Sequence, residues 1–415
     1  MKFIPGKTYI PSSGKVFNHV EIDNAIKVAR DGWWTEGEFV KLFEKQFSSY
    51  LGLKYVTLVN SGSSANLLAL TALTSSVFGK KALRVGDEVI TAACAFPTTV
   101  NPIVQNRLKP VFVDVDLGTR NPTIAVIKKA MTKKTKAIML AHTLGNPLPL
   151  KELMTLVKQH DLWFIEDCCD GLGSTYNGKL LSTFGHVATF SFYPAHQITM
   201  GEGGAVVTNN PLIHRALRQF RDWGRDCWCD SGKDNTCGKR FQWQLGKLPY
   251  GYDHKYTYSQ IGYNLKLTDF QAAIGVAQLK KLPGFISKRK KNFKLLYTFF
   301  KRYEKYFILP TWEEQSDPNW FGFMLVVKEE APFTKLELVQ HFENHAIGTR
   351  GLFAGNLLKH PAYIHRQDLR VAGNLKNSDT ILENGFWIGV YPGITKKMIS
   401  YVQATVKEFI KHHTS

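Results

Sequence analysis

Short apolar runs alternate with helical stretches between residues 54 and 208, and this alternation constrains the fold more than any other feature of the chain. The runs read YVTLV, EVITAA, PVFVDV, KAIMLA, LWFIED and VATFSF, with stretches such as SSANLLALTALTSS and PTIAVIKKAMT between them. Short, nearly continuous apolar runs are typical of strands that are buried on both faces of a parallel sheet. The pattern therefore predicts an α/β fold, a mostly parallel sheet flanked by helices.

The length of the chain allows two domains. It has 415 residues, 44% of them apolar and 21% charged, which is ordinary for a globular protein. We expect a large domain over residues 1–284 and a smaller α+β domain over 285–415, where helical and strand patterns mix. The segment at about 222–258 is aromatic, rich in glycine and too long for an ordinary connection, so we expect it to be functional.

The charge and hydropathy of the chain bear on its partners and location. The formal net charge is +19, but the basic residues are spread along the chain, as in KKTK and SKRKKNFK, without a long basic block. This spread favours solvated surface charge over nucleic-acid binding, and a polyanionic substrate such as a nucleotide sugar would be a further reason for it. No segment approaches the ~18 uninterrupted apolar residues of a membrane helix, and the first residues lack the apolar run of a secretory signal. We expect a cytoplasmic protein without membrane insertion.

Small and polar residues follow several of the predicted strands. Parallel sheets bind ligands at the carboxyl ends of their strands, which brings NSGSSAN, CAFPTT, EDCCD and SFYPAH around one site. NSGSSAN opens a helix, whose free amides and positive dipole end suit a phosphate, although an ordinary capped helix reads the same. EDCCD ends a strand with Glu166 and Asp167, an acid that could pair with a protonated ring nitrogen; taken alone, this stretch favours a solvated loop acid.

The stretch SFYPAHQITMGEGGAVV has glycines on both sides of a glutamate, a composition that lets backbone approach a ligand closely. Its one strong base is His196, and no lysine lies between Lys179 and Lys233.

Together these stretches resemble the DegT/DnrJ/EryC-type sugar aminotransferase family, pyridoxal-phosphate (PLP) enzymes of fold type I that act on nucleotide-linked sugars. The likeness covers nearly the whole chain and includes SGSSA, FPTT, GEGGAVV and GYNLKLTDFQAAIGVAQL. The resemblance implies that Asp167 pairs with the pyridine nitrogen and that Phe96 stacks on the ring. It further implies a homodimer, because Asn264 would reach the phosphate of the neighbouring subunit. The other residues that the resemblance implies at the phosphate, all from one subunit, are Gly62, Ser63, Ser64 and Ser191.

One position departs from the family pattern. Five residues after Ser191 the family carries the lysine that forms the Schiff base, and this chain carries His196. An imidazole does not hold the aldehyde coenzyme as a stable imine, but it moves protons near neutral pH. The resemblance therefore implies that pyridoxamine phosphate (PMP) binds without a covalent link and that His196 is catalytic, rather than a satisfied structural histidine.

Four of the six cysteines have an unusual spacing. Cys169, Cys227, Cys229 and Cys237 form the pattern C-x57-C-x-C-x7-C, which misses the common zinc and ferredoxin spacings. In a reducing compartment such clustering indicates metal or redox chemistry. The pattern resembles the [2Fe-2S] motif of the CDP-4-keto-6-deoxyglucose 3-dehydrases, the branch of the family with histidine in place of lysine. The remaining two, Cys94 and Cys168, are expected to be buried thiols.

This resemblance implies removal of the C3 hydroxyl from a nucleotide-linked 4-keto-6-deoxyhexose, with CDP-4-keto-6-deoxyglucose as the substrate, in 3,6-dideoxyhexose biosynthesis for lipopolysaccharide O-antigen. It implies an NADH-dependent flavin and iron–sulfur reductase as partner. Because Cys169 lies two residues from Asp167, the cluster would lie near the coenzyme ring. Arg350, in GTRGLFAGN, is a candidate for the sugar diphosphate, although an ordinary surface arginine fits nearly as well.

Three alternatives remain open at this point. One is an iron-free, colitose-type 3-dehydratase that is reduced by transamination, and another is a cluster-bearing 3-dehydrase acting on a TDP-sugar. The third, from a different class, is an iron–sulfur regulator that binds nucleic acid through its positive charge.

Overall fold

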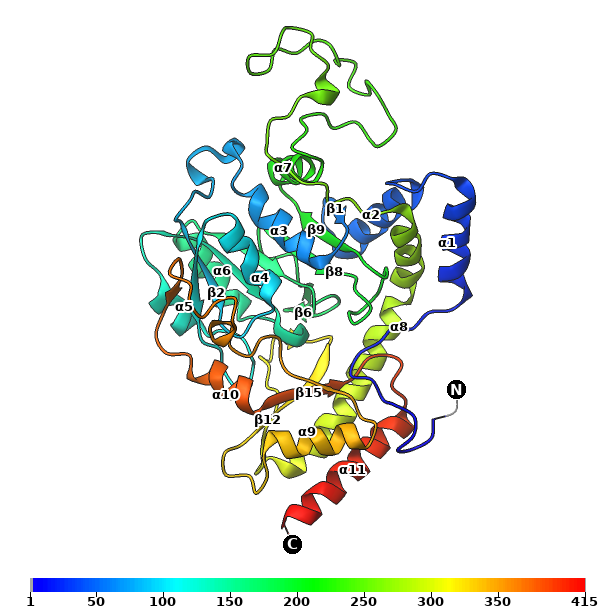
Figure 1. Cartoon of the computed structure of the whole chain (residues 1–415), viewed down its shortest axis with the longest axis vertical. Coiled ribbons are helices and arrows are strands. Elements are labelled where there is room, and N and C mark those ends of the chain that lie inside the picture. Colours follow the sequence, from blue (N-terminus) through cyan, green and yellow to red (C-terminus); the bar gives the residue numbers. More distant parts are fainter. Residues whose placement is uncertain (1–2, 415) are drawn as a thin grey trace.

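An eight-stranded sheet forms the centre of the structure, a computed structural model that describes residues 3–414. Every strand except β9 runs parallel to the others, and helices cover the sheet (Figure 1). This is the architecture of aminotransferase fold type I and confirms the predicted fold class. In spatial order the strands are β1 (Tyr55–Val59), β9 (Gly204–Thr208), β8 (Val187–Ser191), β5 (Trp163–Asp167), β4 (Thr135–Ala141), β2 (Glu88–Ala92), β3 (Lys109–Val113) and β14 (Arg370–Val371).

The six predicted strands all lie in this sheet, as β1, β2, β3, β4, β5 and β8. The sequence pattern missed β9 and β14. β9 follows the glycines of GEGG, which read as a loop, and it returns antiparallel between β1 and β8. β14 has only two residues and comes from the far end of the chain, so no local periodicity marks it.

A second, four-stranded antiparallel sheet contains β10 (Phe307–Ile308), β12 (Gly322–Val327), β15 (Gly385–Gly389) and β13 (Thr349–Arg350). A small sheet joins β11 (Ser316–Asp317) to the hairpin of β6 (Thr175–Tyr176) and β7 (Lys179–Leu180). The α-helices are α1 (His19–Asp31), α2 (Glu38–Leu51), α3 (Gly62–Ala72), α4 (Pro97–Gln105), α5 (Ile124–Ala130), α6 (Leu150–Gln159), α7 (Pro211–Arg221), α8 (Asp269–Phe300), α9 (Lys335–Asn344), α10 (Lys376–Asn384) and α11 (Lys396–Thr414).

The predicted boundary at residue 284 falls inside α8, which continues for 32 residues through both parts of the molecule. The N-terminal segment also crosses the predicted division, because Ile10 bridges to Ile347 and packs in the C-terminal hydrophobic core. The predicted large domain, residues 1–284, is therefore not separated from the rest by a boundary that few contacts cross. The two-domain division stays a prediction.

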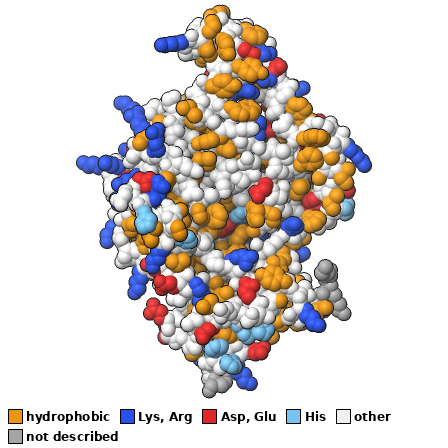
Figure 2. Space-filling view, viewed as in Figure 1, with side chains coloured by type: hydrophobic (Ala, Val, Ile, Leu, Met, Phe, Trp, Pro, Cys, Tyr) orange, Lys and Arg blue, Asp and Glu red, His pale blue; other side chains and the backbone are white. Residues whose placement is uncertain are grey.

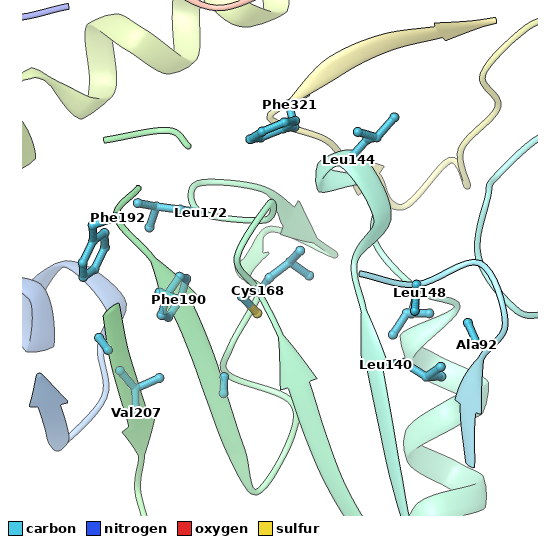
Figure 3. Packing of buried hydrophobic residues seen from close by; sticks show 14 of the residues in the cluster. Ala92, Leu140, Leu144, Leu148, Cys168, Leu172, Phe190, Phe192, Val207 and Phe321 are labelled. Carbon is cyan, nitrogen blue, oxygen red and sulfur yellow. The ribbon is translucent and has the colours of Figure 1, made fainter. Parts of the chain in front are cut away.

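The large core packs on the main sheet and carries apolar side chains from strands distant in sequence. Figure 3 shows Cys168 among them, with Phe190 of β8 and Phe321 of the C-terminal part. Cys94 and Cys168 are both buried in it, which confirms the expectation for these thiols. Burial raises the pKa of Cys94 to about 12. None of the described helices combines the length and the apolar character needed to cross a membrane.

The cysteine-bearing segment 222–258 is irregular apart from one 3₁₀ turn at His254–Tyr256. It projects beyond α7, away from the sheet (Figure 1). Arg240 and Asp253 form an ion pair within it, and the rings of Trp228, Trp243 and His254 pack together. The segment therefore has a structure of its own, rather than being a loose connection.

Candidate active site

A cavity of about 590 Å³ lies at the carboxyl ends of the strands of the main sheet. It is lined by the start of α3, the start of α4, the ends of β5 and β8, and C-terminal residues that include Phe321 and Arg350. The sheet topology thus brings together the four stretches that the sequence placed around one site. Of the residues described, none that lines the cavity is a lysine.

Asp167 is the last residue of β5 and is buried at the floor of the cavity, with 4% exposure. Its Oδ2 accepts hydrogen bonds from Thr99 Oγ1 at 2.7 Å and from Asn66 Nδ2 at 2.8 Å, and its Oδ1 accepts one from the Cys169 amide at 3.1 Å. Thr189 Oγ1 donates to Asn66 Oδ1 at 2.6 Å, which fixes the orientation of the Asn66 amide toward Asp167. A carboxylate held by donors on three elements is ordered before any ligand arrives, so it suits a cationic partner.

Glu166 points to the other face of the sheet, because successive strand residues alternate. Its buried carboxylate accepts hydrogen bonds from the backbone amides of Ser182, Phe184 and Gly185, and it contacts His142 Nε2 at 3.2 Å. Leu148 donates its amide to His142 Nδ1, so the Nε2 of this histidine carries the hydrogen that faces Glu166. Glu166 therefore bonds to groups inside the protein, whereas Asp167 lines the cavity and can contact a bound group.

The N-terminus of α3 meets the end of β8 at close range. A Cβ built on Gly62 would lie 2.4 Å from the Cβ of Ser191, so only glycine lets the helix approach the strand here. Gly62 and Ser63 hold the first two helical positions, where amides have no acceptor within the helix. The Ser64 amide already donates to the capping hydroxyl of Ser61 at 3.1 Å, and Ser64 does not line the cavity. Its predicted role toward a phosphate stays a prediction, whereas Gly62, Ser63 and Ser191 line the cavity together.

His196 lines the same cavity, with its side chain 15% exposed. Its Nδ1 is buried 3.5 Å from the Oδ1 of Asp170 and its ring packs at 5.2 Å from that of Phe321. This placement leaves Nε2 as the nitrogen available to a bound group.

The backbone around His196 is held by Arg289, a fully buried residue of α8. Arg289 donates to the carbonyls of His196 at 3.0 Å and of Phe321 at 3.1 Å. Arg289 belongs to the run SKRKKNFK, which was expected to be solvated surface charge. That expectation is wrong for Arg289, which is buried. Its position matches the buried face of α8, one helical turn from Phe285 and Asn292. Burial lowers the pKa of Arg289 to about 10.

Of the other predicted residues, two line the cavity and one does not. Phe96, just before α4, is 50% exposed and offers its ring face there; its edge contact is with Phe353 at 6.2 Å. Arg350 lines the cavity from β13. Asn264 is exposed and lies outside the cavity of its own chain, where it bridges to Asp222.

The four cysteines divide into two places. Cys169 lines the cavity next to Asp167. Cys227, Cys229 and Cys237 lie in the projecting segment, where the Cys229 amide donates to the Cys227 sulfur at 3.5 Å and Thr236 Oγ1 donates to the Cys229 sulfur at 3.0 Å. No residue of 222–258 lines the cavity that holds Cys169.

The chemistry of the cavity suits a flat cationic ring that carries a phosphate. A buried carboxylate, a helix N-terminus with Ser191 and a half-exposed aromatic ring all line the cavity. The sequence had marked Asp167, His196 and Ser191, but it missed the supporting residues. Asn66, Thr99 and Asp170 belong to the stretches NSGSSAN, FPTT and EDCCD, and their polarity at predicted strand ends was the available signal. Thr189 and Arg289 carried no such signal.

Comparisons with known proteins agree with this geometry. The chain is 52% identical over 407 residues to the lipopolysaccharide biosynthesis protein RfbH of Salmonella typhimurium, covering 98% of this chain and 93% of that protein. It is 50% identical over 408 residues to a dTDP-4-dehydro-2,6-dideoxy-D-glucose 3-dehydratase of Saccharopolyspora spinosa, covering 98% and 88%. A solved structure of Escherichia coli GDP-4-keto-6-deoxy-D-mannose 3-dehydratase with bound hydrated PLP superimposes with a TM-score of 0.85 at 32% identity, covering 96% of this chain and 99% of that one.

The family model for DegT/DnrJ/EryC1/StrS aminotransferases matches residues 17–407, which include all three sheets described above and every residue of the cavity except Ser13. The chain therefore belongs to the DegT/DnrJ/EryC1/StrS aminotransferase family.

Proposed function

We propose that this protein is a PMP-dependent 3-dehydrase of a nucleotide-linked 4-keto-6-deoxyhexose. The observation that carries the proposal is a cavity of the aminotransferase fold lined by His196 and by no described lysine. A coenzyme cavity without a lysine favours dehydration with a free amine over ordinary transamination. Two relatives named as 3-dehydratases, from Saccharopolyspora spinosa and Escherichia coli, support the same reaction class.

The residues present fit the coenzyme. Asp167 would pair with the protonated ring nitrogen, because its carboxylate is ordered by Thr99 and Asn66 and is buried from water. The amides of Gly62 and Ser63 and the hydroxyl of Ser191 would hold the phosphate at the positive end of α3. Phe96 would cover one face of the ring.

When bound, PMP supplies an amine that links to the C4 ketone of the sugar and a ring that withdraws electrons as the C3 hydroxyl leaves. His196 would take a proton from the C4′ carbon at its Nε2. Asp170, 3.5 Å from Nδ1, stabilises the positive charge that the imidazole then carries. Arg350 is proposed to bind the sugar diphosphate from the rim of the cavity.

The cysteine motif extends the proposal to a [2Fe-2S] cluster and to an NADH-dependent flavin and iron–sulfur reductase that supplies electrons. Three cysteines gather in the segment 222–258 and are hydrogen-bonded at sulfur, as cluster ligands are. Cys169 lies apart from them, so a single chain does not bring all four ligands together. We therefore assign no reaction step to the cluster.

The identity of the substrate's nucleotide is the most specific part of the proposed function. We propose CDP-4-keto-6-deoxyglucose as the substrate and a 3,6-dideoxyhexose for lipopolysaccharide O-antigen as the end product. The relative RfbH, named for lipopolysaccharide biosynthesis, supports that end product. A dTDP-linked sugar is the second candidate, since a relative named for such a substrate is 50% identical over 98% of this chain.

The test follows the C4′ hydrogen of PMP. Protein purified without oxygen and loaded with PMP should exchange this hydrogen with solvent when a 4-keto-6-deoxyhexose is added as its CDP, dTDP or GDP derivative, and fastest with CDP. His196→Asn should abolish the exchange. Cys227→Ser serves as the matched control and should retain it, because proton transfer needs only the coenzyme. Exchange that persists in His196→Asn would remove His196 from the reaction.

A second measurement asks whether His196 occupies the position of the Schiff-base lysine. His196→Lys with PLP should be trapped by borohydride as a covalent adduct, and the parent protein should not. A parent protein that is trapped uses some other lysine, which would contradict the proposal.

A further inference from the structure

Two cysteines of the projecting segment, Cys227 and Cys229, are anchored near one edge of the main sheet. Asp226, next to Cys227, accepts hydrogen bonds from Arg215 and Gln219 of α7. On the other side of the cysteine pair, Ser231 donates to Glu36, just before α2. Both α7 and α2 pack against β1, the edge strand.

Cys169 leaves a strand in the interior of that sheet. The order β1, β9, β8, β5 puts three strand spacings between the edge strand and β5, roughly 14 Å at ~4.8 Å for each spacing. One binuclear cluster does not bridge such a separation. The hydrogen bonds of Asp226 to α7 and of Ser231 to Glu36 also oppose a large swing toward the cavity of the same chain.

The segment presents large apolar side chains that stay partly exposed in its own chain. Trp228, Phe241 and Tyr250 are 43%, 55% and 72% exposed, and Ile261, just after the segment, is 96% exposed. Figure 2 shows hydrophobic side chains on the surface of this projecting segment, at the top of the view. An exposed patch of large aromatic side chains beside an incomplete ligand set indicates an interface. A second copy of this chain has what the set lacks, a half-buried cysteine that lines the cavity.

We infer that the four-cysteine set is completed between two copies of this chain, with Cys169 of one subunit facing Cys227, Cys229 and Cys237 of the other. The inference rests on the proposed cluster and adds that the site exists only in the dimer. Each dimer then has two such sites, and each site draws ligands from both chains.

Mixed dimers test this assignment without any measurement of activity. Two differently tagged chains are expressed together, and dimers that carry both tags are isolated without oxygen. Iron, acid-labile sulfide and visible absorbance are then measured per dimer. In the first pair, one chain carries Cys169→Ser and the other carries Cys227→Ser, Cys229→Ser and Cys237→Ser. Assembly between chains leaves one complete site, so this dimer should contain half the iron of the wild type.

The reciprocal pair joins a wild-type chain to a chain with all four cysteines changed to serine. Assembly between chains leaves no complete site, and iron should be absent, whereas ligands from one chain would give half the iron. That reversed pattern would overturn the inference. Full iron in a homodimer of Cys169→Ser would overturn it as well, because Cys169 would then not be a ligand.

A wild-type dimer that contains no iron would instead contradict the cluster in the proposed function, and the inference with it. Should the serine variants not fold, iron-free wild-type protein can be treated with a short bis-maleimide. A link between Cys169 and the projecting segment that joins two chains supports the inference, and one within a single chain contradicts it. Iron bound by a protein that sediments as a monomer would also overturn it.

Discussion

The contact between Gly62 and Ser191 allows a sharp test of how the phosphate end of the cavity is built. In Gly62→Ala the new Cβ would lie 2.4 Å from the Cβ of Ser191 and 3.1 Å from its Cα. One residue begins α3 and the other ends β8, so neither backbone moves freely. Overpacking of this kind costs about 1–3 kcal/mol, and the better helix propensity of alanine returns at most about 1 kcal/mol. We expect the free energy of unfolding to fall by about 1–2 kcal/mol.

A second substitution separates packing from binding. Ser191→Gly removes the two closest atoms, the Cβ at 2.4 Å and the Oγ at 2.8 Å, so Gly62→Ala combined with Ser191→Gly should regain most of the stability lost to the clash. The double-mutant cycle should show a favourable coupling of about 1–2 kcal/mol. Its affinity for PMP should not recover, because the double variant lacks the Ser191 hydroxyl proposed to hold the phosphate.

The assay is guanidinium unfolding followed by tryptophan fluorescence, at one protein concentration because binding and association shift apparent stability. Equilibrium dialysis with PMP runs in parallel on all four proteins. A Gly62→Ala protein as stable as the wild type, or a coupling near zero, would refute the argument that this glycine is required by the close approach of helix and strand.

Three further predictions concern single side chains. Thr99→Val should raise the dissociation constant of PMP about tenfold in dialysis, because a hydrogen bond to a charged group contributes about 1.5–3 kcal/mol; Thr99→Ser keeps the hydroxyl that contacts Asp167 and should bind normally. Arg289→Met should lower the free energy of unfolding by about 3 kcal/mol, because the buried carbonyls of His196 and Phe321 lose their donor. It should also slow the C4′ exchange, and Arg289→Lys should rescue part of both. Burial raises the pKa of Glu44 from 4.5 to about 7, so the folded state holds its proton more tightly. Stability should fall as pH rises from about 4.5 to about 7, by up to about 3 kcal/mol in all, and then level off. Glu44→Gln should flatten this slope in denaturation curves between pH 5 and 8.

Local patterns were enough for much of the fold. The six apolar runs became strands of the main sheet, because a buried strand needs only a few consecutive apolar residues and a break at each end. The same patterns could not place β14, whose partner β3 lies more than 250 residues earlier in the chain. They also could not separate Arg289 from its basic neighbours, because its burial depends on what packs against α8.

Within the site, the residues that carry the chemistry could be found from the sequence, whereas the residues that hold them in place could not. The resemblance to the family singled out Asp167 and His196, although the EDCCD stretch taken alone favoured a solvated loop acid. The bond from Asn66 to Asp167 joins residues 101 positions apart, and the bond from Thr189 to Asn66 joins residues 123 apart. No local pattern encodes such pairs.

The sequence by itself determined the α/β architecture, the acid at the end of β5, the histidine in place of a lysine and the spacing of four cysteines. Each of these is a property of residue identity or of short-range periodicity. Only the tertiary structure decided which polar groups order Asp167, which arginine holds the loop of His196, and that Cys169 lies apart from the other three cysteines. These depend on distances through space, which the strand order of the sheet fixes and the chain order does not.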